Sequence, residues 1–114
     1  MSNKRVNKLK KRKVKSTNII SISNNKIMIK SKIDVYGAQL EFNKGVVIKN
    51  KHRGLNIQSG PDGKIILIYD QQMVTPLNEK VLFEYKSKNK SKAKLSKYIL
   101  SDKNAKQIPN VIIK

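Results

Sequence analysis

The chain has 114 residues, of which 26 are Lys or Arg and 7 are Asp or Glu, so its formal net charge is +19. That charge is far above the roughly 2 to 8 that keeps a small domain soluble, and it favours a polyanionic partner. The sequence contains no cysteine, which excludes disulfides and zinc–thiolate sites. It also has no apolar run near the about 20 residues of a membrane-spanning helix, and no secretory signal at its start. We therefore expect an intracellular or virion-borne protein that makes no contact with a membrane.

Residues 1–17 contain eight basic residues, no acidic residue and few apolar side chains. Such a segment cannot bury enough apolar surface to fold alone, so we predict an extended basic arm. Consecutive cations neutralise phosphates without a fixed fold, which indicates contact with nucleic acid or with neighbouring subunits. A purely solubilising tail is the alternative. The predicted contact residues are Lys4, Arg5, Lys8, Lys10, Lys11, Arg12, Lys13 and Lys15.

From Asn18 onward the pattern changes to short segments of alternating apolar residues, which are typical of β-strands. Asn18–Ile22 and Lys26–Lys30 are separated by a Ser-Asn-Asn turn and predict a first hairpin. In Ile33–Phe42, the side chains expected on one face are Tyr36, Ala38, Leu40 and Phe42. Further short strands are expected at Val46–Ile48, around Leu55 and Ile57, at Leu95–Leu100 and at Asn110–Ile113.

The strongest strand pattern is Lys64–Asp70, which has five consecutive apolar residues. Because this run is short and rich in β-branched residues, we predict a strand buried on both faces. The turn before it contains Pro61, Asp62 and Gly63: proline pre-sets φ, aspartate can bond its own backbone, and glycine can adopt a positive φ. The next segment, Val81–Tyr85, alternates, so its first, third and fifth residues are expected to face the core.

Lysine occupies every second position from residue 86 to residue 94. A turn is expected at residues 88–90, and if paired strands flank it, these lysines form a solvated basic tip. We therefore predict a second basic patch, formed by Lys86, Lys88, Lys90, Lys92 and Lys94.

About nine short strands and no helical periodicity predict an all-β fold, an antiparallel β-sandwich of residues 18–114 preceded by the basic arm. The segment Gln71–Lys80 contains Pro76 and is too short for a helix, but it is long enough to cross from one sheet to the other.

Four segments occur in an order that resembles a known fold: VYGAQLEFN at 35–43, DGKIILIYD at 62–70, VLFEYK at 81–86, and SDKNAKQIP at 101–109, where Ala105 stands in place of a turn glycine. Over about residues 26–113 the chain resembles the jelly-roll sandwiches of the cohesin-like and carbohydrate-binding-module-like families. The resemblance implies a jelly-roll fold and an interaction module rather than a catalyst.

Candidate catalytic and metal-binding residues are sparse. His52 lies between Lys51 and Arg53, and we interpret it as a solvated loop residue rather than a general base. Asp102 and Asn104 begin like a calcium-binding loop, but the glycine and glutamate that complete such a loop are missing. The aromatic residues occur in strand patterns typical of the core, so stacking platforms for bases are not expected. We predict no enzymatic activity, no cofactor and no metal.

The sequence therefore predicts a structural or interaction protein that docks on other subunits of a large assembly, with the arm contacting a polyanion. A viral capsid or head-decorating protein fits this description first. The alternatives are a ribosome-associated RNA-binding protein and a cohesin-type module that binds protein or carbohydrate.

Overall fold

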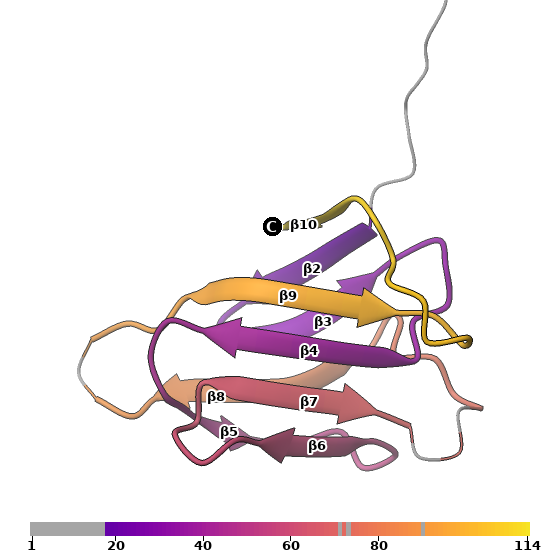
Figure 1. The fold of residues 1–114 in the computed structure, drawn as a ribbon. Coiled ribbons are helices and arrows are strands. Elements are labelled where there is room, and N and C mark those ends of the chain that lie inside the picture. Colours follow the sequence, from indigo (N-terminus) through magenta and orange to yellow (C-terminus); the bar gives the residue numbers. More distant parts are fainter. Residues whose placement is uncertain (1–17, 71, 73, 90) are drawn as a thin grey trace, which may run out of the picture.

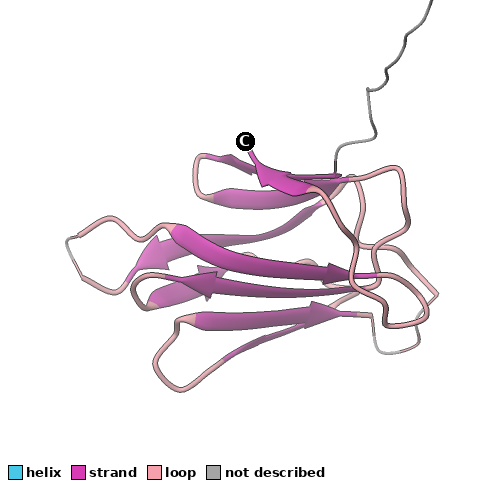
Figure 2. Ribbon diagram, turned by 45° about the horizontal axis from the view of Figure 1, so that its top comes forward, coloured by secondary structure: helices cyan, strands magenta, loops and turns pink. Residues whose placement is uncertain are grey.

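A computed structural model describes residues 18–70, 72, 74–89 and 91–114. Within these residues the chain forms strands and loops and no helix, and the strands lie in two facing layers (Figures 1 and 2). The predicted all-β sandwich is confirmed. The strands are β2 (Asn18–Ser23), β3 (Lys26–Lys30), β4 (Gly37–Phe42), β5 (Val46–Lys49), β6 (Asn56–Ser59), β7 (Ile65–Tyr69), β8 (Val81–Ser87), β9 (Leu95–Ser101) and β10 (Val111–Ile113).

Among the described residues, one sheet has five strands in the order β10-β2-β3-β8-β5, and the other has four in the order β6-β7-β4-β9. Neighbouring strands are antiparallel except for β10, which pairs with β2 in parallel. Since β7 and β8 belong to different sheets, the segment between them crosses the sandwich, as the sequence predicts. The short β10 lies beside β2 at one end of the molecule (Figure 1).

Two turns form as their residue types predict. Asn24 and Asn25, between β2 and β3, have φ values of 51° and 61°. A two-residue hairpin loop with both residues at positive φ matches the twist of the strands, and asparagine tolerates that conformation better than most residues. In the turn before β7, Gly63 has a φ of 76°. There the backbone N–H of Lys64 donates a 3.0 Å hydrogen bond to the Asp62 carboxylate.

The core lies between the two sheets and is built from inward-facing side chains at alternate strand positions. Phe42 of β4 and Tyr85 of β8 meet across the layers, with ring centroids 4.8 Å apart and planes inclined by 52°. The largest fully buried side chains are Phe42, Phe83, Ile20, Ile27, Ile29, Leu40, Ile66, Ile68, Leu77, Leu82, Leu100 and Val35.

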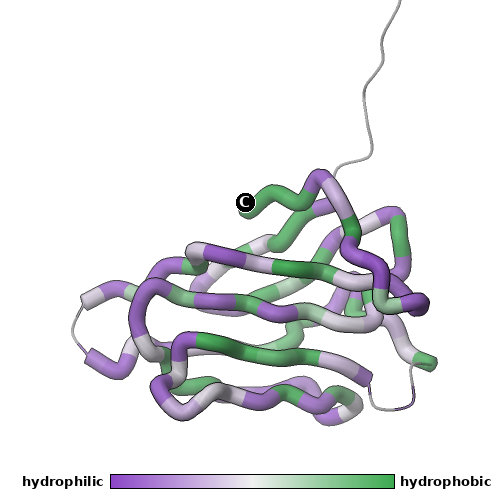
Figure 3. The backbone as a smooth tube through the Cα atoms, viewed as in Figure 1, coloured by the Kyte–Doolittle hydropathy of each residue, from purple (hydrophilic) through white to green (hydrophobic). Residues whose placement is uncertain are grey.

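The prediction that Lys64–Asp70 is buried on both faces is wrong. Ile66 and Ile68 are buried, but Ile65 is 39% exposed and Leu67 is 41% exposed. A strand is covered on both faces only where layers pack on both sides of its sheet, and in a two-layer sandwich each sheet has one free face. Figure 3 shows apolar residues along most of β7. The side chains on one face of this strand pack in the core, and those on the other face meet solvent.

The strict alternation expected for Val81–Tyr85 is interrupted. Phe83 and Tyr85 are buried as expected, but Leu82 is buried as well and Val81 is 40% exposed. The pairing of β3 with β8 shifts here, because Ile27 is opposite Phe83 while Met28 is opposite Val81. This β-bulge inserts Leu82 as an extra residue and changes the face on which Val81 lies.

Candidate functional site

The outer face of the four-stranded sheet is an uncovered surface with an ordered arrangement of side chains. Strand register places Gln58, Leu67, Gln39 and Ile99 in one row across β6, β7, β4 and β9. Leu67 and Ile99 are 41% and 44% exposed, so the row alternates amide and aliphatic side chains that both meet solvent. This row forms the middle of the surface, which we call the apolar face.

A shallow depression of about 260 Å³ lies on the apolar face. Gly37 contributes no side chain there, and the depression is lined further by Leu67, Tyr69, Ile99 and Ser101. A Cβ atom added to Gly37 would lie 2.7 Å from the Ser101 hydroxyl oxygen, so a larger residue would displace the Ser101 side chain and fill the depression. The missing side chain therefore gives the apolar face a hollow next to its exposed aliphatic groups.

Charge is nearly absent from the apolar face. Its outward strand positions include one acid, Glu41, and one base, Lys97, and the register places these two residues opposite each other on β4 and β9. They balance to zero in a chain with a formal net charge of +19. An exposed apolar surface that lacks net charge has the composition of the centre of a protein–protein interface.

The uninterrupted apolar run Ile65–Tyr69 is the sequence signal for the apolar face. By its pattern it predicts a strand covered on both sides, whereas in the structure it supplies one core face and one exposed apolar face. A run of apolar residues is equally typical of these two situations, so the run alone does not separate them. The exposed site residues Leu67 and Ile99 could therefore not be identified from the sequence.

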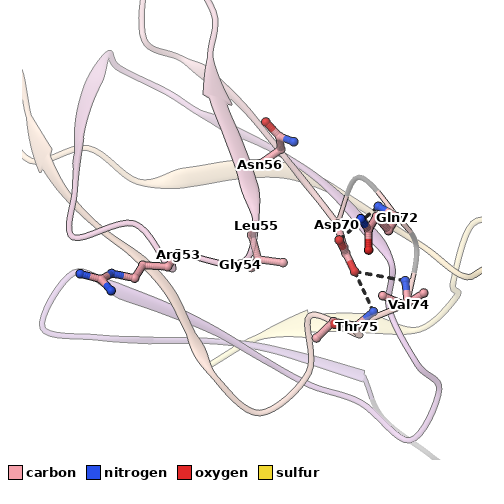
Figure 4. Close-up of a pocket in the computed structure, with 8 residues that line it drawn as sticks. All are labelled: Arg53, Gly54, Leu55, Asn56, Asp70, Gln72, Val74 and Thr75. Atoms are coloured by element: carbon pink, nitrogen blue, oxygen red, sulfur yellow. Dashed lines mark hydrogen bonds between the residues drawn. The ribbon is translucent and has the colours of Figure 1, made fainter.

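A second hollow, of about 430 Å³, opens beside Asp70 at the end of β7 (Figure 4). The Asp70 carboxylate accepts hydrogen bonds from the backbone N–H groups of Gln72, Val74 and Thr75, at 3.2, 3.1 and 2.7 Å. The Arg53 side chain also belongs to this hollow but points away from the carboxylate (Figure 4).

The hydrogen bond from Thr75 lowers the pKa of Asp70 below its ordinary value, against the opposing effect of burial. The bonds from Gln72 and Val74 lower it further. Since its oxygens are engaged by the backbone of its own loop, Asp70 fastens the crossing segment between the sheets and is not free to serve as an acid or base.

The other residues considered for chemistry also have structural roles. His52 Nδ1 accepts a 3.2 Å hydrogen bond from the backbone N–H of Gly54. The Asp102 carboxylate accepts bonds from the backbone N–H groups of Asn104 and Lys106, at 2.9 and 3.0 Å. In the part of the chain that the structure describes, no three His, Asp or Glu side chains come together as metal ligands would. Within the same part, no helix could cross a bilayer.

The predicted basic residues fall into three groups. The eight cations of the arm, Lys4 to Lys15, lie outside the described residues, and so does Lys90. Lys86 lies on β8 in the five-stranded sheet, while Lys88, Lys92 and Lys94 are exposed in the connection that leads to β9. Because β8 and β9 belong to different sheets, the strands that flank this connection are not paired with each other. The condition for the predicted hairpin tip is therefore not met.

No protein-family model matches this sequence. No curated protein matches it either. The fold is similar to a chain in the crystal structure of a CaDoc0917–CaCohA2 complex at pH 5.5, with a TM-score of 0.48 and 14% sequence identity over 88% of this chain and 95% of that chain. The two-sheet β-sandwich that the sequence resemblance implied is the architecture that the described strands form.

Proposed function

We propose that this protein is a non-enzymatic interaction module that docks on another protein of a large assembly through the apolar face. The observation that carries the proposal is the exposure of Ile65, Leu67 and Ile99 on one sheet surface whose charges balance. Burying exposed apolar area contributes roughly 25 cal/mol per Å², so covering these side chains favours association.

The partner expected on this face has an apolar ridge, which enters the hollow above Gly37, and acidic residues around that ridge. The reason for the acidic rim is charge complementarity, since cations outnumber acids throughout the rest of this chain. Complementary rims raise the association rate and align the partners, while the uncharged centre avoids the cost of burying unpaired charges. A second copy of this chain fits less well because two molecules of charge +19 repel each other.

The assembly that we expect is a virus particle, in which the protein would serve as a capsid or head-decorating subunit. The ribosome is the alternative. Small size, strong positive charge and the cationic arm of residues 1–17 support both settings. They differ in the arm's target, because a ribosomal protein places its arm on RNA and a capsid protein can also place it on neighbouring subunits.

Co-sedimentation of the full chain with virus particles and with ribosomes tests this function. We expect the wild type to sediment with one of the two particles and L67K/I99K to sediment at least fivefold less. The matched control is V47K, which places a lysine at an apolar position of the other sheet that is 48% exposed.

V47K is expected to sediment at least as well as the wild type. Thermal melts followed by circular dichroism should show that all variants keep the fold. Equal sedimentation of L67K/I99K and the wild type would contradict docking through the apolar face. Failure of the wild type to sediment with either particle would contradict the proposed setting.

A further inference from the structure

The outer face of the five-stranded sheet differs in charge from the apolar face. Its outward strand positions include Lys26, Lys30, Lys49 and Lys86, all of them exposed, and one acid, Glu84. The formal charges of these five residues sum to +3, whereas those of Glu41 and Lys97 on the apolar face cancel. We call this second surface the basic face.

The register shows how the single acid of the basic face is compensated. Glu84 of β8 is opposite Lys26 of β3 on one side and opposite Lys49 of β5 on the other. Its carboxylate also accepts a 2.9 Å hydrogen bond from the Asn50 side chain. One carboxylate flanked by two lysines and an amide leaves the surrounding surface positive, and it does not repel an anion as an uncompensated acid would.

The basic face has a depression of about 360 Å³ whose polar lining can attract an anion or donate to it. Ser21 and Ser23 of β2 bring hydroxyl groups, Lys26 and Lys30 bring ammonium groups, and no carboxylate lines it among the described residues. Lysine and serine side chains are typical donors to the phosphate oxygens of nucleic acids. The chemistry of the lining therefore matches a phosphate.

The spacing of the lysines suits a ligand that presents several phosphates in a row. Lys26 and Lys30 are four residues apart on one strand, or about 13 Å at 3.3 Å per residue. Lys26 and Lys49 are two strands apart, or about 10 Å at 4.8 Å per strand. These separations allow each lysine to contact a different phosphate of one backbone, which a single small anion cannot offer.

We propose that the basic face binds the sugar–phosphate backbone of a nucleic acid, independently of base sequence. No aromatic side chain lies at the outward strand positions of this sheet among the described residues, so stacking on bases has no platform there. Two apolar residues, Met28 and Val81, line the depression, and Val47 and Ile112 are exposed at other outward positions of this sheet.

Chain connectivity supports the same occupant. Residues 1–17 with their eight cations precede Asn18, the first residue of β2, so they are joined to this sheet. The sequence therefore attaches further positive charge to the sheet that carries the basic face.

Fluorescence anisotropy of the full chain with labelled 20-nucleotide single-stranded RNA, single-stranded DNA and duplex DNA tests the proposal. The test variant is K26Q/K30Q/K49Q/K86Q. The matched control, K64Q/K97Q/K103Q/K106Q, removes four exposed lysines outside the basic face and lowers the net charge equally. We expect the test variant to bind at least tenfold more weakly than the control, and its plot of log K against log salt to be flatter by about 3 to 4 for the duplex.

Lysine acetylation read by mass spectrometry repeats the test on the wild type, so the result does not depend on the variant's folding. Bound nucleic acid should protect Lys26, Lys30, Lys49 and Lys86 more than the four control lysines. Equal affinity of test and control variants, equal protection of both sets, or equally tight binding of poly-glutamate or of phosphatidylserine vesicles would overturn the proposal. L67K/I99K should bind nucleic acid as the wild type does, which separates this result from docking through the apolar face.

Discussion

Leu67 and Phe83 are both large apolar strand residues, yet they occupy opposite environments. Phe83 is 0% exposed and its ring centroid lies 6.5 Å from that of Tyr85, whereas Leu67 is 41% exposed on the apolar face. The sequence predicts both of them in the core, Leu67 from a continuous apolar run and Phe83 from an alternating pattern. Their difference therefore separates the residues that hold the sandwich together from those available to a partner.

We expect F83A to lower the free energy of unfolding by about 3 to 5 kcal/mol, because it removes a buried ring and leaves a cavity. L67A should lower it by less than about 1 kcal/mol, since an exposed strand residue contributes mainly local packing. Urea unfolding at pH 7 measures both changes. Similar losses for the two variants would show that Leu67 belongs to the core after all.

Asp70 makes the stability of the fold depend on pH in the acidic range. Hydrogen bonds from Thr75 and then from Gln72 and Val74 hold its pKa below the ordinary value of 3.8. A carboxylate with a lowered folded-state pKa contributes stability that is present above its unfolded-state pKa and is lost as pH falls through the folded-state pKa.

D70N should therefore lower the Tm at pH 7 and reduce the fall in Tm between pH 5 and pH 2. D34N, which changes an exposed acid before β4, serves as the control and should follow the wild type. Thermal melts across this pH range measure the effect. A D70N curve parallel to that of the wild type would show that the Asp70 loop does not contribute to acid sensitivity.

At the scale of elements, the connections between the sheets are fastened by polar side chains. Asn78 accepts a 2.8 Å hydrogen bond from the Val35 backbone N–H and donates to the Ser31 and Ile33 carbonyl oxygens at 3.1 and 3.0 Å. Together with Asp70, it adds side-chain hydrogen bonds to a segment whose backbone also bridges to β3, where the Glu79 N–H donates to the Ile29 carbonyl oxygen at 2.8 Å. Because the backbone polar groups of these loops have hydrogen-bond partners, the positions at which the chain changes sheet are fixed.

The turn between β9 and β10 is strained at Ala105, which has a φ of 62°. A residue with a Cβ pays roughly 1 to 2 kcal/mol in this left-handed region, and glycine does not. Glycine also makes the unfolded chain more flexible, which reduces the gain in stability by about 0.4 to 1 kcal/mol. We expect A105G to stabilise the protein by up to about 1 kcal/mol and A105V to destabilise it. Urea unfolding checks both, and a loss of stability in A105G would contradict this account of the turn.

At the scale of the whole molecule, the sandwich separates two kinds of surface. The apolar face covers the β6-β7-β4-β9 sheet, and the basic face covers the β10-β2-β3-β8-β5 sheet. Because the two sheets are opposite layers of one sandwich, a protein partner and a nucleic acid could bind at the same time without competing for side chains.

Deletion of Met1–Lys15 should leave the sandwich folded and weaken polyanion binding. If all eight arm cations met duplex phosphates, the slope of log K against log salt would flatten by about 7, which is an upper bound. Anisotropy titrations with duplex DNA at several salt concentrations measure the change. K88S/K90S/K92S, in the connection between β8 and β9, is the comparison. If the deletion alters neither affinity nor slope while K88S/K90S/K92S abolishes binding, the arm does not contact nucleic acid.

Several features of this protein could be predicted from the sequence because they depend on neighbouring residues. Gly63 and Asp62 form the expected turn, and the strand alternation of Ala38, Leu40 and Phe42 is seen as expected. Turn chemistry and the two-residue period of a strand are local properties, so the all-β class and most strand positions could be predicted in advance.

The tertiary structure decided which faces stay uncovered. Whether Leu67 is buried depends on a second layer over its sheet, and whether Leu82 faces inward depends on the bulge opposite Ile27 and Met28. The basic face likewise arises because β3, β5 and β8, which are far apart in sequence, become neighbours. These outcomes are set by long-range pairing and register, which a local pattern of residues does not encode.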